Sequence, residues 1–218
     1  MAPNNWDPLI FAHEQPSEQC TVRVKRDLAE FNANPPPGIF VAAEENNISK
    51  VHAIIAGPVG TPYEGGFFQF FLKFPTDYPM SPPRVRHITT DAGRVLFNQH
   101  FYRSEETPGA SDQYNDLIRH ETMRVAVCDQ VEACLKETIK CPPSLSSQIL
   151  KLFLESYDKY EYAVSTKLHL TDRQMKDPYT RVVSKYQYET LLSRLKSLRE
   201  QVDKKNEEAA KAAAEAAA

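Results

Sequence analysis

Residues Gly57–Pro83 decide the fold of this chain, and they read GPVGTPYEGGFFQFFLKFPTDYPMSPP. The prolines and the Gly65-Gly66 pair interrupt regular structure, and the two glycines supply the backbone freedom that a tight turn into a strand requires. Residues 67–74 then alternate in the manner of a strand, with every second side chain on the same side. One side carries Phe68, Phe70, Leu72 and Phe74. The stretch therefore predicts a turn, a strand and a stiff proline-rich loop.

The composition limits the class of protein. A chain of 218 residues holds one domain with an extension or two small domains, and 41% hydrophobic residues are enough for a real core. A net charge of -3 argues against a general nucleic-acid-binding protein, which is normally basic. No apolar run approaches the roughly 20 residues that span a bilayer, and the first ten residues lack the features of a signal peptide. Four cysteines do not make a disulfide framework, so we expect a soluble intracellular protein with reduced thiols.

The first helix is predicted to begin after Ser17, a good N-cap, and to end near Asn32. Its apolar stripe consists of Cys20, Val24, Leu28 and Phe31. The basic residues lie away from this stripe, and they are Arg23, Lys25 and Arg26. Such a face is either simply solvated or a surface for a partner.

Four strands with short connections follow Pro35-Pro36-Pro37-Gly38, and they are predicted at residues 39–43, 51–56, 67–74 and 84–89. Short connections make neighbouring strands antiparallel, so the pattern predicts a meander with a helix on one face. A polar loop over residues 44–47 joins the first two strands.

Helical patterns dominate the second half of the chain. A long helix is predicted from Ser111 to about Lys140, and another over residues 145–167 with Ser144 as its N-cap. A loop over residues 171–179 precedes a third helix over residues 186–202. The remaining alanine-rich residues predict a frayed helical tail.

The Gly57–Pro83 stretch resembles the core of the ubiquitin-conjugating enzymes, whose pattern runs G-P-x-x-T-P-Y-E-G-G, an aromatic strand and F-P-x-x-Y-P-x-x-P-P. Trp6-Asp7-Pro8 and the helical piece Tyr114–Asp129 are similar to the Z-type subgroup of that family. The resemblance implies an α+β fold with a four-stranded antiparallel meander, flanking helices and a C-terminal helical extension. It also implies a pathway that operates in the cytoplasm and the nucleus, without a cofactor, a metal, a nucleic acid or a membrane.

The same resemblance implies the partners and their contact residues. The family's first helix offers basic residues to the ubiquitin-activating enzyme, which assigns this role to Arg23, Lys25 and Arg26. An apolar residue on the proline-rich loop faces ubiquitin ligases in the family, and Met80 occupies that position here. Ubiquitin or a ubiquitin-like modifier is the implied third partner.

The chain departs from the family where the chemistry takes place. The motif F-H-P-N-x-Y, whose asparagine stabilises an oxyanion in the family, is replaced here by Asn98, Gln99 and His100 flanked by Phe97 and Tyr102. The chain then passes from Arg103 to an acidic loop, without the family's active-site cysteine and without the central helix. We therefore expect no catalytic residue of the family's kind.

The four cysteines of the chain offer no replacement nucleophile. Cys20 lies on an apolar stripe, and Cys128 lies in the middle of a predicted helix, where a free cysteine is normally buried. Cys134 lies later on the same helix. Cys141 is the most exposed candidate, but it is far along the chain from the strand ends that the chemistry uses. Cys134 and Cys141 also lack the spacing of zinc ligands.

We predict an extended lead-in over residues 1–16, a truncated conjugating core over 17–140, a helical extension over 141–205 and an alanine-rich tail over 206–218. Three interpretations of function stay open. The chain is an active conjugating enzyme, or a non-catalytic module that binds an activating enzyme or a ligase, or a splice or gene-model product of an active parent. Loss of the central helix is expected to expose Phe68, Phe70 and Leu72 or their neighbours on the opposite face, unless the downstream helices cover them.

Overall fold

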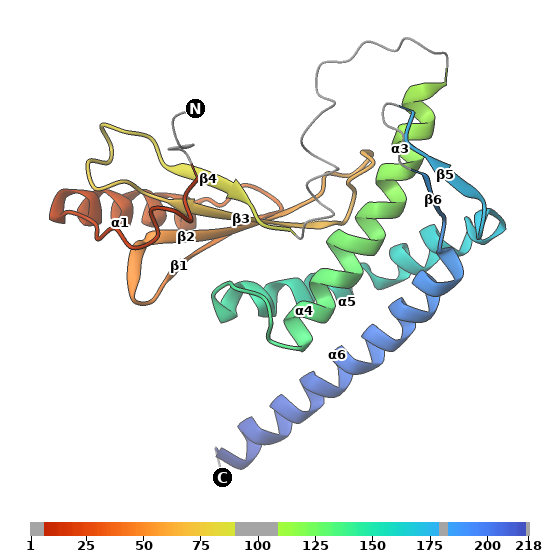
Figure 1. Ribbon diagram of the computed structural model, residues 1–218. Helices are drawn as coiled ribbons and strands as arrows, with labels where there is room; N and C mark the ends of the chain where they lie inside the picture. The colour runs from red at the N-terminus through yellow and green to blue at the C-terminus, as the bar shows by residue number, and fades with distance from the viewer. Residues whose placement is uncertain (1–6, 90–108, 179–182, 217–218) are drawn as a thin grey trace.

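The structure is a computed structural model, and it describes residues 7–89, 109–178 and 183–216 (Figure 1). The predicted α+β class is confirmed. In chain order the elements are α1 (Glu18–Ala33), β1 (Ile39–Glu44), β2 (Asn47–Ala56), β3 (Phe67–Lys73), β4 (Arg84–His87), α3 (Ala110–Glu121), η1 (Thr122–Asp129), α4 (Gln130–Leu135), α5 (Pro143–Ser165), η2 (Leu168–Leu170), β5 (Gln174–Lys176), β6 (Val183–Lys185) and α6 (Tyr188–Ala216).

The first four strands form one antiparallel sheet in the order β1-β2-β3-β4, which confirms the predicted meander. The β1–β2 connection is tighter than the predicted loop, because Glu44 pairs with Asn47 and only two residues lie between the strands. The β2–β3 register pairs Ile54 with Gln69 and Ile55 with Phe68. Since paired residues point to the same face, Ile54 and Phe68 lie on opposite faces of the sheet.

Helix α1 covers one face of the sheet near the loop that follows β3. The Ser17 hydroxyl accepts a hydrogen bond from the Cys20 amide at 3.1 Å, so the predicted N-cap is confirmed. Cys20 and Val24 are fully buried against Val51 and Phe74. The predicted apolar stripe therefore joins the helix to the sheet.

Helices α4 and α5 lie against the opposite face, below the sheet in Figure 1. Ile54 and Phe67 of the sheet belong to the same buried cluster as residues of η1, α4, α5 and α6. The largest side chains that this cluster buries completely include Phe67, Phe153, Ile54, Ile149, Leu191, Leu195 and Leu198. The downstream helices thus share one core with the sheet.

Of the three residues expected to be exposed, Phe68 is buried, whereas Phe70 and Leu72 are half-buried. Phe68 is only 4% exposed, because the rings of Tyr63 and His87 pack on it. Leu72 packs in the α1 cluster, and Phe70 is half-buried with the ring of His87 at 4.9 Å. The expected loss of the central helix falls on residues 90–108, outside the described residues, and stays a prediction.

The Gly65-Gly66 pair allows the β2–β3 loop to approach the helices closely. Gly65 has a φ of +74°, which L side chains rarely adopt, and a Cβ there would lie 2.7 Å from Tyr160 Cε1. A Cβ at Gly66 would lie 2.7 Å from Thr122 Cγ2. The glycines predicted for a tight turn therefore also serve as a contact with α5 and η1.

The predicted long helix runs from Ala110 to Leu135, five residues short of the predicted end. Its middle, η1, is a π-helix of eight residues, which the sequence did not reveal. Six of these eight residues are buried, so this segment does not have the single apolar stripe of a surface helix. The segment is buried on several sides because it contacts β3, α4 and α6.

Two helix boundaries near the C-terminus differ from expectation. The predicted N-cap at Ser144 is wrong, because α5 already begins at Pro143 with Pro142 as its N-cap. Proline suits a first helical turn, where its missing N–H would have had no partner. Helix α6 continues past the predicted end at Val202 to Ala216, so the predicted helical tail is part of the same helix, and its end extends away from the rest in Figure 1.

The predicted loop at residues 171–179 contains a strand instead. β5 pairs with β6 in a second, two-stranded sheet that packs against α3 through Met175. No helix in residues 7–89, 109–178 and 183–216 is long and apolar enough to cross a membrane.

Candidate functional site

The basic face of α1 is exposed to solvent. Arg23, Lys25 and Arg26 are all exposed, as their position away from the apolar stripe predicted. Arg23 Nε forms an ion pair with Asp27 Oδ1 at 2.9 Å, one helical turn along. In the described part of the chain Lys25 and Arg26 form no ion pair, so both remain available for an acidic partner.

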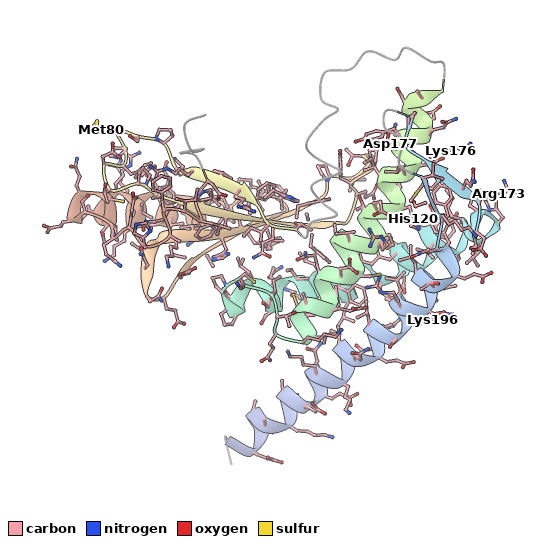
Figure 2. The ribbon with its side chains drawn as sticks, in the orientation of Figure 1. Met80, His120, Arg173, Lys176, Asp177 and Lys196 are labelled. Atoms are coloured by element: carbon pink, nitrogen blue, oxygen red, sulfur yellow. The ribbon has the colours of Figure 1, made fainter. Side chains whose placement is uncertain are left out.

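Met80 lies on the loop between β3 and β4 and is 78% exposed. This loop is attached to α1 by two contacts. Tyr78 donates a hydrogen bond to Asp27 Oδ2 at 2.6 Å, and the Ser17 hydroxyl donates to the Thr76 carbonyl at 2.5 Å. Figure 2 shows Met80 above α1, at the opposite end of the molecule from the β5–β6 hairpin.

Asp27 connects the two predicted contact regions. Partial burial opposes its ionisation, but hydrogen bonds from Tyr78 and Arg23 hold the pKa of Asp27 below its usual value. Its carboxylate therefore stays ionised and fixes Arg23 on one side and the Met80 loop on the other. The sequence placed these residues in separate elements, and the structure brings Arg23 and Met80 onto one surface.

None of the four cysteines is exposed. Cys20, Cys128 and Cys134 are buried, and Cys141 is half-buried. Burial raises the pKa of all four thiols, and it raises those of Cys128 and Cys134 to about 12. The thiolate is the reactive form, so these positions disfavour nucleophilic chemistry at neutral pH. The predicted core position of Cys20 and Cys128 is confirmed, and Cys134 is buried as well.

Cys141 lines a shallow cavity of about 410 Å³, together with Glu44, His52 and Lys140. The histidine that could activate this thiol is engaged elsewhere. His52 Nε2 contacts Glu44 Oε1 at 3.2 Å, and the Cys141 sulfur contacts the Ser146 hydroxyl at 3.3 Å. Burial still raises the pKa of this thiol despite the hydroxyl.

Asn98, Gln99 and His100 lie outside the described residues, so their predicted place in a degenerate oxyanion motif stays a prediction.

In residues 7–89, 109–178 and 183–216 no cluster of His, Cys, Asp and Glu has an arrangement that could hold a metal ion.

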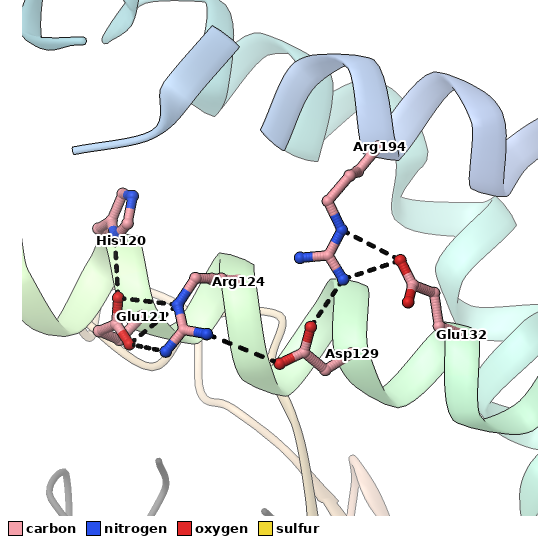
Figure 3. Close-up of polar contacts among 6 residues, drawn as sticks. All are labelled: His120, Glu121, Arg124, Asp129, Glu132 and Arg194. Carbon is pink, nitrogen blue, oxygen red and sulfur yellow. Dashed lines mark hydrogen bonds and ion pairs between the residues drawn. The ribbon is translucent and has the colours of Figure 1, made fainter. Parts of the chain in front are cut away.

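A charged network that sequence reasoning missed joins η1 to α6 (Figure 3). Glu121 accepts hydrogen bonds from His120 Nδ1 at 2.9 Å and from Arg124 Nε at 3.1 Å. Arg124 also approaches Asp129, whose Oδ1 accepts a hydrogen bond from Arg194 of α6 at 2.6 Å. The three-residue spacing of Glu121 and Arg124 was the sequence signal for one link, but nothing local indicated Arg194.

The protonation of this network follows from its contacts. The backbone amide of Gln187 donates to His120 Nε2 at 3.0 Å, so Nε2 carries no proton and Nδ1–H donates to Glu121. Burial disfavours the Glu121 carboxylate, but hydrogen bonds from His120 and Arg124 outweigh it and lower the pKa of Glu121 to about 2. The network thus attaches the start of α6 to the end of α3.

The comparison with known proteins identifies the family. The family model described as Ubiquitin-conjugating enzyme matches residues 23–102. Ubiquitin-conjugating enzyme E2 Z of Danio rerio is 37% identical over 250 residues, which cover 92% of this chain and 75% of that protein. The chain belongs to the E2 Z-type ubiquitin-conjugating enzyme family.

Two further similarities accompany this match. Ubiquitin-conjugating enzyme E2 Z of Homo sapiens is 36% identical over 248 residues, which cover 91% of this chain and 69% of that protein. The solved structure of human Ubiquitin-conjugating enzyme E2 G1 is similar over 32% of this chain and 57% of that chain, with 40% identity and a TM-score of 0.31. The E2 Z relatives and the family model confirm the predicted membership in the ubiquitin-conjugating enzyme family and its Z-type subgroup.

Proposed function

We propose that this member of the E2 Z-type ubiquitin-conjugating enzyme family takes part in ubiquitin or ubiquitin-like protein conjugation without forming a thioester itself. The observation that carries the proposal is that the cysteine thiols are inaccessible and have raised pKa values. All four cysteines are buried or half-buried, and burial raises the pKa of each. A catalytic thiol needs access to the modifier and a lowered pKa.

The comparisons support the same proposal. The family match over residues 23–102 contains none of the four cysteines, which are at positions 20, 128, 134 and 141. The alignment with the Danio rerio relative is 250 positions long, whereas this chain has 218 residues. The alignment covers 92% of the chain, about 200 residues, so about 50 of its positions have no residue of this chain, as expected if a segment is missing after Arg103.

The test is a charging reaction. The chain is incubated with ubiquitin-activating enzyme, ATP and ubiquitin, or a ubiquitin-like modifier, and the products are separated with and without reductant. We expect no adduct that reductant removes. A reductant-sensitive adduct that disappears in Cys141→Ser, and persists in the matched Cys128→Ser variant, would refute the proposal.

A second candidate function is binding without catalysis, through the surface that contains Arg23, Lys25, Arg26 and Met80. The observation that favours it is the attachment of the exposed Met80 loop to the exposed basic face of α1 through Asp27. The proposed partners are a ubiquitin-activating enzyme and a ubiquitin ligase, and the proposed location is the cytoplasm and the nucleus.

Binding is tested separately from charging. The triple variant Arg23→Glu, Lys25→Glu, Arg26→Glu should weaken association with the activating enzyme, and Met80→Ser should weaken association with a ligase. The charge-matched control is the triple variant Lys151→Glu, Lys196→Glu, Lys204→Glu, which makes the same change in net charge on exposed lysines of α5 and α6. Equal weakening by the control, or no measurable association of the unmodified chain, would remove this function. Whether the chain is a splice or gene-model product is decided by the transcript sequence across Arg103 and Ser104.

A further inference from the structure

A groove of about 570 Å³ lies between the β2–β3 loop and α5, with part of η1 lining it. We call it the α5 groove. Its α5 wall is formed by residues at helical spacing, namely Ser156, Lys159, Tyr160 and Ala163, and Lys167 lines the groove just after the end of the helix. Its volume falls within the range of about 300–1,000 Å³ that is usual for binding sites.

The two walls of the α5 groove are fixed relative to each other. The Tyr160 hydroxyl donates a hydrogen bond to the Gly65 carbonyl at 2.7 Å, and the Thr122 hydroxyl donates to the Pro62 carbonyl at 3.2 Å. The absent side chain at Gly65 is what allows the Tyr160 ring to lie against the loop. A groove that is already formed requires little ordering when a ligand binds.

The groove has exposed apolar side chains on both walls. Val59 of the loop is 82% exposed and Tyr162 of α5 is 73% exposed, and both line the groove. Both are large hydrophobic residues that the rest of the described chain leaves uncovered. Exposed apolar groups that gather in one hollow typically mark an interaction site.

The charges at the groove are predominantly positive. Arg119, Lys159 and Lys167 line it, against the single carboxylate of Glu64. Glu64 already accepts a hydrogen bond from the Gly60 amide at 2.8 Å. Arg119 and Lys167 both pair with Asp116, whereas Lys159 is exposed and has no ion pair within the described ranges.

We propose that the α5 groove binds an extended acidic peptide segment of a partner protein. An apolar side chain of the peptide packs on Val59 and Tyr162, and a carboxylate of the peptide pairs with Lys159. The charge excess of the groove selects acidic over basic segments, since an unpaired cation beside an apolar surface favours a carboxylate. This surface is distinct from the Met80 surface, so it stands whether or not the chain forms a thioester.

The test begins with a library of random peptides displayed on phage. The full chain is the target, and the Lys159→Glu, Tyr162→Ala double variant removes peptides that bind elsewhere. We expect the enriched peptides to combine aspartate or glutamate with aromatic or aliphatic residues. A fluorescein-labelled copy of the most enriched peptide is then titrated and followed by anisotropy.

The titration separates the groove from general electrostatics. Lys159→Glu should raise the Kd about tenfold, as the loss of one charge-assisted contact does, and Tyr162→Ala should raise it about fivefold. Lys151→Glu makes the same charge change on the same helix outside the groove and should leave the Kd unchanged. All three side chains are exposed, so the variants retain the fold.

Three results would overturn the proposal. Enrichment of basic peptides, or of none, would contradict the selectivity for acidic segments. Equal effects of Lys159→Glu and Lys151→Glu would show that only the net charge of the chain matters. Self-association of the chain that Tyr162→Ala abolishes would identify a second copy as the occupant.

Discussion

Replacing Phe153 by alanine should loosen the sheet as well as the C-terminal helices. Phe153 is fully buried in α5, with its ring stacked on Tyr160 at 5.9 Å and edge-on to Tyr157 at 6.0 Å. It shares one cluster with Ile54 and Phe67 of the sheet. A Phe to Ala change in a core lowers the free energy of unfolding by about 3–5 kcal/mol. That is a large part of the roughly 5–15 kcal/mol that stabilises a typical domain.

Amide hydrogen exchange measures the loss of stability in the sheet and in the C-terminal helices. If the sheet and the helices unfold together, exchange in β2 and in α6 should accelerate by about two to four powers of ten. Tyr162→Ala on the same helix is the control, because Tyr162 is 73% exposed and should change stability by less than about 0.5 kcal/mol.

The result that would refute this reasoning is protection that falls in α6 but not in β2. The sheet and the C-terminal helices would then unfold separately, which would favour the predicted boundary at residues 140–141. Parallel loss in both elements would instead place them in one cooperative unit.

Three further predictions rest on single side chains. Arg194→Met should lower the free energy of unfolding by about 1–2 kcal/mol, because the ion pairs of Arg194 with Asp129 and Glu132 are partly exposed. Denaturant titration should show that this loss is smaller at high salt, which screens the ion pairs. A loss that does not depend on salt would contradict the electrostatic cause. Burial lowers the pKa of His87 from 6.5 to about 4, so its contribution to stability is complete above pH 6.5 and is lost as the pH falls to 4. Thermal unfolding of His87→Phe should lack that part of the pH dependence, and an unchanged profile would exclude His87 as its source. Gly65→Ala should lower the melting temperature more than Gly60→Ala. Both glycines have a positive φ, but only at Gly65 would a new Cβ meet the Tyr160 ring. An equal fall in melting temperature in the two variants would mean that backbone strain alone is the cause.

The first half of the fold was predictable from the sequence because its signals are local. Ser17, the alternation at residues 67–74 and the short connections each depend on neighbours along the chain, and the helix cap, the β3 strand and the meander were confirmed. The boundary error at Ser144 arose because serine and proline both suit a helix start, and proline at the first position took precedence.

The second half was harder, because its decisive contacts join distant residues. Nothing around Gly65 indicates that Tyr160, far along the chain, lies against it, and nothing around Asp129 indicates Arg194. The β5–β6 hairpin was missed because each strand has only three residues, too few for an alternating pattern. The exposure of Met80 and of the basic α1 face was predictable, but their shared surface depends on Asp27.

The π-helix η1 has a consequence for how this chain tolerates substitution. Val125, Ala126, Val127 and Cys128 are each at most 1% exposed, in contact with the sheet on one side and α6 on the other. A larger or more polar side chain there has no direction in which to reach solvent, unlike on a helix with one free face. These buried residues lie outside residues 23–102, which the family model matches. We therefore expect substitutions in η1 to be tolerated as poorly as substitutions in the buried face of the sheet.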